Sequence, residues 1–179
     1  MVLFVRCHLN WLATSSTRGL AGWVLRHNHT VVLSHVADDP RWIARSPDQK
    51  SGSVIAMPIK HGETLIGVMT LFHEQPNHFP GYDPLLLEGL AALVSLALTA
   101  TRRRISEMMR RDQSLALLST SQHLTVERTL EDVAMLLQEK SVSLFDVTYG
   151  LLFLSNEHGV LAPVAVARHA RGTTEQDHC

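Results

Sequence analysis

The stretch that decides the fold is Ser53–Phe72, which reads SVIAMPI at 53–59, KHGE at 60–63 and TLIGVMTLF at 64–72. Two runs rich in apolar and β-branched residues, joined by a short connection that contains a glycine, predict an antiparallel hairpin. Both faces of the second strand are apolar, with Leu65, Met69 and Leu71 on one side and Ile66, Val68 and Phe72 on the other. Such a strand lies inside a sheet that is covered on both faces, so we expect these side chains to be buried. Gly67 predicts that another element packs closely there.

Upstream of this hairpin the sequence predicts shorter elements. Residues 2–7 (VLFVRC) have the composition of a short strand, Gly19–His27 that of a short helix, and Val31–Leu33 that of a small strand. At 38–42, two aspartates followed by a proline predict a turn that leads into one helical turn, with an aspartate as its cap.

Downstream, Asp83 and Pro84 have the residue types favoured at the N-cap and first position of a helix. Spacings of 4, 3 and 4 predict its inner stripe as Leu86, Leu90, Leu93 and Ala97. Beyond Thr101, the arginines at 102–104 and 110–111 indicate an exposed connector helix. A seam of Leu98, Ile105, Met108 and Leu115, next to Asp112, predicts a weak parallel coiled coil.

The last part of the chain predicts one more helix and one more hairpin. The helix runs from Val126 to Leu144, with the inner stripe Leu130, Val133, Leu137 and Leu144. The hairpin consists of strands at 149–154 and 160–166, joined by Asn156, Glu157, His158 and Gly159.

Composition narrows the class of protein. The chain has 179 residues, a formal net charge of −1 and 18% charged residues, which indicates a globular protein with no bulk attraction to nucleic acid. Its two cysteines, Cys7 and Cys179, lie near opposite ends, so we expect no disulfide framework and a cytoplasmic location. The apolar run Leu85–Ala100 is shorter than the roughly 20 residues of a membrane span, so we expect no span.

No motif for catalysis or metal binding stands out. The Walker loop, the dinucleotide G-x-G-x-x-G and the H-E-x-x-H pair are missing, so we expect no catalytic residue, and Gly19-x-x-Gly22 is better explained as entry into a helix. The histidines are scattered, with His27, His29, His158 and His169 in or near predicted loops. We therefore expect no metal site, and the residues single out neither a cofactor nor a ligand-binding set.

Several pieces of the chain, in this order, resemble the second half of a GAF domain: GLAGWV at 19–24, VADDPR at 36–41, VIAMPI at 54–59, LIGVMTL at 65–71 and FPGYDP at 79–84. His35 departs from the family, which often has aspartate before this V-x-x-D-P-R. The segment 115–167 is similar, more loosely, to the first half of a GAF domain. The resemblance implies an α/β (α+β) fold with a mainly antiparallel central sheet and helices on both faces.

The resemblance divides the chain into three parts: residues 1–100 as the C-terminal part of one GAF copy, 101–114 as a connector helix, and 115–179 as the N-terminal part of a second copy. The first part alone would leave one sheet edge unpaired and one face bare. The second part supplies the missing elements, either within the chain as a circularly permuted domain or by exchange between two chains. If it does so, strand 149–154 joins the sheet and helix 126–144 covers one face.

The resemblance implies a sensory or regulatory module of a bacterial signalling protein with a small-molecule ligand, and the seam along 98–115 predicts a homodimer formed through the 84–115 helix. Relatives act on histidine kinase or cyclic-dinucleotide cyclase output domains, which this chain lacks. A ligand-free structural and dimerisation module is the alternative. Cys7-His8 resembles the bilin-attachment pair of phytochromes but lies too early in the chain. An enzyme that reduces methionine sulfoxide is a third hypothesis, which requires a cysteine near the pocket.

Overall fold

A computed structural model describes residues 2–3, 19–44, 50–79, 81–115, 129–156 and 159–169. Within these ranges, six strands form one antiparallel sheet in the order β1-β6-β5-β4-β3-β2. They are β1 (Val2–Leu3), β2 (Val31–Leu33), β3 (Ser53–His61), β4 (Thr64–His73), β5 (Tyr149–Ser155) and β6 (Leu161–His169). The helices are α2 (Gly19–His27), the 3₁₀ turn η1 (Val36–Asp38), α3 (Pro84–Leu115) and α4 (Leu130–Leu144).

The predicted central hairpin is confirmed. β3 and β4 pair in register from Ser53↔His73 to Ile59↔Gly67, and Gly62 takes a φ of 59° in the tight connection. Met69 and Leu71 are fully buried, whereas Leu65 and Ile66 are half-buried because they lie next to the turn of the hairpin. Ile66 also packs on the same side as Met69, beyond a register shift between Ile59 and Lys60, so its predicted face is wrong.

β4 and β5 are neighbours in the sheet, so the sheet combines strands from the first and the last part of the chain. The register runs from Gly67↔Leu154 to Phe72↔Tyr149. A Cβ atom on Gly67 would lie 2.3 Å from the carbonyl oxygen of Phe153, so the prediction of close packing at Gly67 is confirmed and β5 is the neighbour. Strands from 1–100 and from 115–179 therefore complete one sheet within this chain, while the assignment of these parts to two GAF copies stays a prediction.

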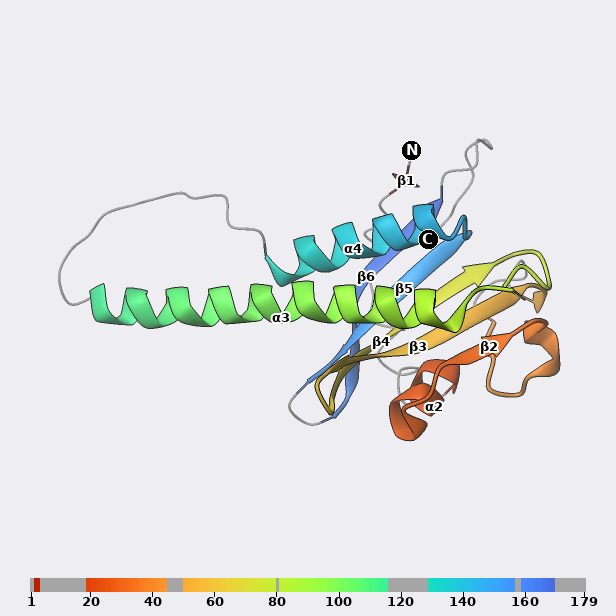
Figure 1. Cartoon of the computed structure of the whole chain (residues 1–179), viewed down its shortest axis with the longest axis horizontal. Coiled ribbons are helices and arrows are strands. Elements are labelled where there is room, and N and C mark those ends of the chain that lie inside the picture. Colours follow the sequence, from red (N-terminus) through yellow and green to blue (C-terminus); the bar gives the residue numbers. More distant parts are fainter. Residues whose placement is uncertain are drawn as a thin grey trace.

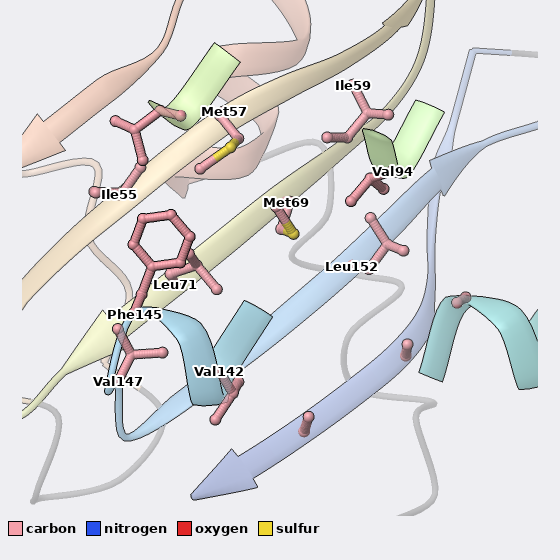
Figure 2. Close-up of a cluster of buried hydrophobic side chains, with 14 of the residues drawn as sticks. Ile55, Met57, Ile59, Met69, Leu71, Val94, Val142, Phe145, Val147 and Leu152 are labelled. Atoms are coloured by element: carbon pink, nitrogen blue, oxygen red, sulfur yellow. The ribbon is translucent and has the colours of Figure 1, made fainter. Parts of the chain in front are cut away.

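The sheet lies between two helical layers (Figure 1). α3 packs on β3, and α4 packs on β5, β6 and α3, so both helices cover one face, as expected for the predicted 126–144 helix. α2 packs on β3 and β4 from the other face. Alternation along the strands sends side chains to two separate cores. Figure 2 shows the core under α3 and α4, which includes Met69, Leu71 and Leu152.

The inner stripe of α3 differs from the predicted one. Leu87, Val94 and Leu98 are buried against the sheet, whereas Leu86 is 48% and Leu93 65% exposed. The helix carries leucine or alanine around most of its circumference between 85 and 100, so the spacing alone does not select a face. The start of the helix is as predicted, because the Leu85 amide donates to Asp83 Oδ1 at 2.9 Å.

α4 begins at Leu130, where Thr129 forms a capping box with Asp132. The residues buried on its inner face are Ala134, Gln138, Ser141 and Val142. The predicted stripe is therefore wrong at Leu144, which is 66% exposed, and only partly buried at Leu130, Val133 and Leu137. The cause is the short distance to the sheet. A Cβ atom on Gly150 would lie 1.9 Å from Gln138 Nε2, so small residues and a glycine, rather than leucines, fit between helix and strand.

Two loops complete the description: the one after β2 differs from its prediction, and the one between β4 and α3 was not predicted. The helical turn lies at Val36–Asp38, before the proline and not after it, and Asp39 accepts a hydrogen bond from the Arg41 amide at 2.8 Å. Between β4 and α3, His78 Nε2 and Tyr82 Oη each donate to the Phe145 carbonyl oxygen at 3.2 Å. The hydrogen bonds of His78 and Tyr82 hold the start of α3 against the end of α4.

Candidate functional site

A hollow of about 50 Å³ opens on the face of the sheet that α2 covers. The strands contribute its floor, and the start of α2 and the loop after η1 contribute its wall. The lining consists of Gly19, Leu20, Ala21, Trp42, Ile43, Val54, Thr70, Phe72, Tyr149, Leu151 and Phe153. Strand pairing explains the floor, since Phe72↔Tyr149, Thr70↔Leu151 and Val68↔Phe153 are cross-strand neighbours on the same face. Of the described residues that line it, none is charged.

Three aromatic rings form a stack at the hollow. The Phe72 ring lies between Trp42 and Tyr149, with centroid distances of 5.4 Å to Trp42 and 4.8 Å to Tyr149. The interplanar angles are 10° and 23°, which is a stacked arrangement suited to planar aromatic groups. Phe72 and Tyr149 are held by hydrogen-bonded central strands, whereas Trp42 comes from a loop.

Gly19 brings the start of α2 against this loop. It has a φ of 75°, which favours glycine, and a Cβ atom there would lie 3.0 Å from Ile43 Cδ1 and 3.2 Å from the Arg41 carbonyl oxygen. Gly19 therefore does more than open a helix, because its missing side chain lets residues 41–43 close one wall of the hollow.

An ion pair fixes the loop that carries Trp42. Arg41 Nη2 lies 2.5 Å from Asp39 Oδ2, and the Arg41 guanidinium also stands over the Trp23 ring at 4.6 Å. The hydrogen bond from the Arg41 side chain lowers the pKa of Asp39 below its usual value, and Asp39 in turn raises the pKa of Arg41. The Trp42 amide donates to the Asp39 carbonyl oxygen at 3.0 Å. Arg41 is thus engaged outside the hollow.

The outer face of α3 is a second candidate surface. Four leucines on this helix are exposed: Leu85, Leu86, Leu93 and Leu96. Leu85, Gly89, Leu93 and Leu96 lie on the side opposite Leu87, Val94 and Leu98, which contact the sheet. Figure 1 shows that the later turns of α3 extend beyond the sheet. The helix therefore buries one apolar side within the chain and carries a second, exposed one, a type of surface that often marks an interaction site.

The segment Pro84–Met108 is long and apolar enough, by length and composition alone, to cross a membrane, with 25 residues and a mean hydropathy of 1.7. The expectation of no span rested on the shorter run Leu85–Ala100. In the structure the same helix buries Leu87, Val94 and Leu98 in the core under the sheet. Of this apolar window 22% is buried within the chain, and the rest includes an exposed apolar face.

The residues singled out from the sequence are scattered. His27 Nδ1 donates to the Trp23 carbonyl oxygen at 2.9 Å and its ring stacks on Trp23, while His29 Nδ1 donates to the His27 carbonyl oxygen. Within the described ranges, no group of three or more histidine, cysteine or acidic residues could hold a metal ion. Cys7, His8, His158 and Cys179 lie outside the described residues, and His169 is described only as the end of β6.

The predicted coiled-coil seam is wrong at its first position. Leu98 is fully buried in the core of its own chain, so it cannot face a second helix. Ile105 is half-buried and Met108 is 36% exposed, and the side chains of Leu115 and Asp112 lie outside the description. Arg103 and Arg104 are exposed, as expected for a connector, and Arg102 is half-buried.

Sequence reasoning missed the residues of the hollow. Thr70 and Phe72 lie on the face of β4 that the alternation pattern defines, and Tyr149 and Leu151 have the corresponding spacing of two on β5. The missing information was the β4–β5 register, which brings these four residues together. Trp42 had no signal in the sequence, because a loop position carries no periodicity.

A family model for the GAF domain matches residues 2–98, which is more than half of the 179 residues. Comparisons with curated proteins and with solved structures found no match.

Proposed function

The chain belongs to the GAF domain family, whose members are generally sensory or regulatory modules, and from this premise we propose that a small molecule binds in the hollow under α2. The observation that carries the proposal is the composition of the lining. Val54, Thr70 and Phe72 come from the first part of the chain, and Tyr149 and Leu151 from the last. A concave, mainly apolar site with few polar groups is typical of small-molecule sites.

A molecule in this hollow contacts the elements that hold the sheet together. It touches β3, β4 and β5 from one side, and α3 and α4 pack on the other side of the same strands. Binding shifts a conformational equilibrium only if two states differ in affinity. The hollow provides such a difference, because a shift of α2 and of residues 41–43 against β4 and β5 changes its volume.

The homodimer through the 84–115 helix remains part of this proposal, on a corrected face. Leu93 and Leu96, both 65% exposed, support a contact on the outer side of α3. Apolar side chains with this exposure are buried when two copies place their α3 helices together. The helix then connects the sheet to a partner copy and to a kinase or cyclase output domain elsewhere in the signalling protein.

We further propose that the module is not catalytic and acts in the cytoplasm of a bacterium. The lining of the hollow supports the first point, because its described residues include no pair of groups suited to acid–base or nucleophilic work. Only two cysteines in the sequence support the second. The ligand-free dimerisation module stays the second candidate, favoured by the exposed α3 face alone.

Native mass spectrometry of the freshly purified chain tests both functions. We expect twice the 19.9 kDa chain mass plus a co-purified small molecule. Leu151→Trp, which fills the hollow, should remove the small molecule and keep the dimer. Leu93→Glu should remove the dimer and keep the small molecule, and Arg103→Gln on the exposed part of α3 is the matched control. A dimer without any adduct would favour the ligand-free module, and a monomer without one would contradict both.

A further inference from the structure

Trp42 differs from the other aromatic residues of the hollow in how it is attached. Phe72, Tyr149 and Phe153 belong to β4 and β5, whose backbones are hydrogen-bonded to strands on both sides. Trp42 is part of an irregular loop, and its neighbours Ile43 and Ala44 are exposed. Its indole is only half-buried, yet it lies nearly parallel to Phe72, at an interplanar angle of 10°. Trp42 is therefore a lining residue that can move out of the hollow without breaking the hydrogen bonds of the sheet.

The hollow is so small that a side chain must leave it before an aromatic ring can enter. With Trp42 in place it measures about 50 Å³. An apolar cavity of roughly 150 Å³ is known to hold benzene, so the hollow as it stands is too small for an enclosed aromatic ring. Removal of the indole frees the volume of a bicyclic ring directly beside Phe72.

The charge of the lining limits the class of molecule. Thr70 and Tyr149 contribute hydroxyl groups to a surface that is otherwise mainly apolar and aromatic, and the described lining contains no charged side chain. Among the described residues beside the hollow, Arg41 is a cation, and it pairs with Asp39 and stands over the Trp23 ring. An anion in this hollow would lose its hydration without gaining a counter-charge from the described lining, which costs several kcal/mol. A neutral molecule does not have this cost.

We propose that Trp42 is a tethered occupant of the hollow, and that the ligand is a neutral, planar aromatic molecule of about the size of indole that stacks on Phe72 in its place. This inference rests on the proposed ligand site under α2 and adds the class of ligand and the side chain that it displaces. The free protein holds its own indole against Phe72, and the ligand competes with it.

Displacement of Trp42 also couples the hollow to the rest of the molecule. The Trp42 amide is hydrogen-bonded to the Asp39 carbonyl oxygen, and Ile43 packs against Gly19 at the start of α2. When the indole leaves Phe72, residues 41–43 move with it, and the contact that positions α2 changes. A module that senses a molecule needs such a structural difference between its free and bound states.

Isothermal titration calorimetry with indole as the probe tests this inference. The full chain is compared with Trp42→Ala, which removes the occupant, and with Asp39→Asn, which loosens the tether without changing the lining. If Trp42 fills the hollow in about 90% of molecules, its removal should tighten indole binding about tenfold. Asp39→Asn should tighten it less. Val32→Ala, at an exposed position of β2 outside the hollow, is the control.

Two more probes define the class of ligand. Benzoate has a ring and a negative charge, and cyclohexanol is neutral but not planar, so both should bind Trp42→Ala at least about tenfold more weakly than indole does. Phe72→Leu should abolish indole binding in the Trp42→Ala background.

The outcomes separate this inference from the proposed function. Equal indole affinity in the full chain and in both tether variants would overturn displacement, and benzoate binding as tight as indole binding would overturn the class of ligand. If no variant that keeps its circular dichroism spectrum binds indole, both the displacement of Trp42 and the proposed class of ligand would be overturned. A co-purified molecule that is lost in Leu151→Trp would still support the hollow as a ligand site in each of these cases.

Discussion

Gln138→Met should make the protein more stable, although it changes a fully buried residue. Gln138 lies on the inner face of α4 with no exposed surface, and neither its Nε2 nor its Oε1 has a hydrogen-bond partner among the described residues. Its amide lies against Gly150, on the same side as Leu71 Cδ2. The amide has therefore lost its hydrogen bonds to water without gaining replacements from the described part of the chain.

The magnitude follows from that loss. A buried polar group left without a partner costs about 1–3 kcal/mol, and methionine has a similar length, no strong hydrogen-bonding group and enough flexibility to fill an irregular gap. We expect the free energy of unfolding to rise by about 1–3 kcal/mol. With a slope of about 2–3 kcal/mol per molar urea for a chain of this size, the midpoint should rise by about 0.3–1.5 M.

Urea unfolding followed by circular dichroism measures this change. Leu136→Met on the exposed side of the same helix is the control, and it should change the free energy of unfolding by less than about 0.5 kcal/mol. A lower urea midpoint for Gln138→Met than for the unchanged chain would refute the reasoning, because it would mean that the amide is satisfied and stabilises the core.

Three further changes test other parts of the structure. Leu71→Ala should lower the free energy of unfolding by about 2–5 kcal/mol, because Leu71 is fully buried in the core under α3 and α4. A decrease of less than about 1 kcal/mol, measured by urea unfolding, would contradict this placement. Gly150→Ala should cost about 1–3 kcal/mol, because its Cβ would overlap Gln138, and the added change Gln138→Ala should recover part of the loss in a double-mutant cycle. Asp39→Asn should lower the thermal midpoint at neutral pH. Because Arg41 lowers the pKa of Asp39 in the folded state, this stabilisation is present above the unfolded pKa of about 3.9 and disappears as the pH falls through the folded value; the midpoints of the two proteins should converge below pH 4, and a difference that stays constant would argue against the ion pair.

The hairpins and the helix starts were accessible from the sequence because local signals determine them. Gly62 between two β-rich runs, and Asp83 followed by Pro84, each act over only a few residues and appear in the structure where they were predicted. The apolar pattern on both sides of β4 also predicted two helical layers, which α2 on one side and α3 with α4 on the other provide.

The inner faces of the helices were not accessible in the same way. α3 carries leucines around its circumference, so periodicity could not show that Leu98 is inside and Leu93 outside. In α4 the short distance to Gly150 selects Ala134 and Ser141 for the interface, and Leu144 is exposed. These choices depend on the packing of elements that are distant in sequence, which no local pattern records.

The hollow depends on the same long-range information. Its floor exists only because Thr70 pairs with Leu151 and Phe72 with Tyr149, across about eighty residues of chain. Its wall depends on a loop tryptophan whose position is set by the Asp39–Arg41 pair and by Gly19. The sequence contained each of these residues but no signal that they meet.

The pairing of β4 with β5 within one chain is therefore the central claim, and a cysteine pair tests it most directly. Thr70→Cys and Leu151→Cys, introduced together after Cys7→Ser and Cys179→Ser, place two thiols at directly opposite positions of neighbouring strands. Such positions lie about 4.5–5.5 Å apart between Cα atoms, within the range of a disulfide. On oxidation under dilute conditions, a non-reducing gel should show a disulfide-closed monomer. A disulfide-linked dimer would mean that β5 is exchanged between two chains, and free thiols in the folded protein would mean that the two strands do not pair.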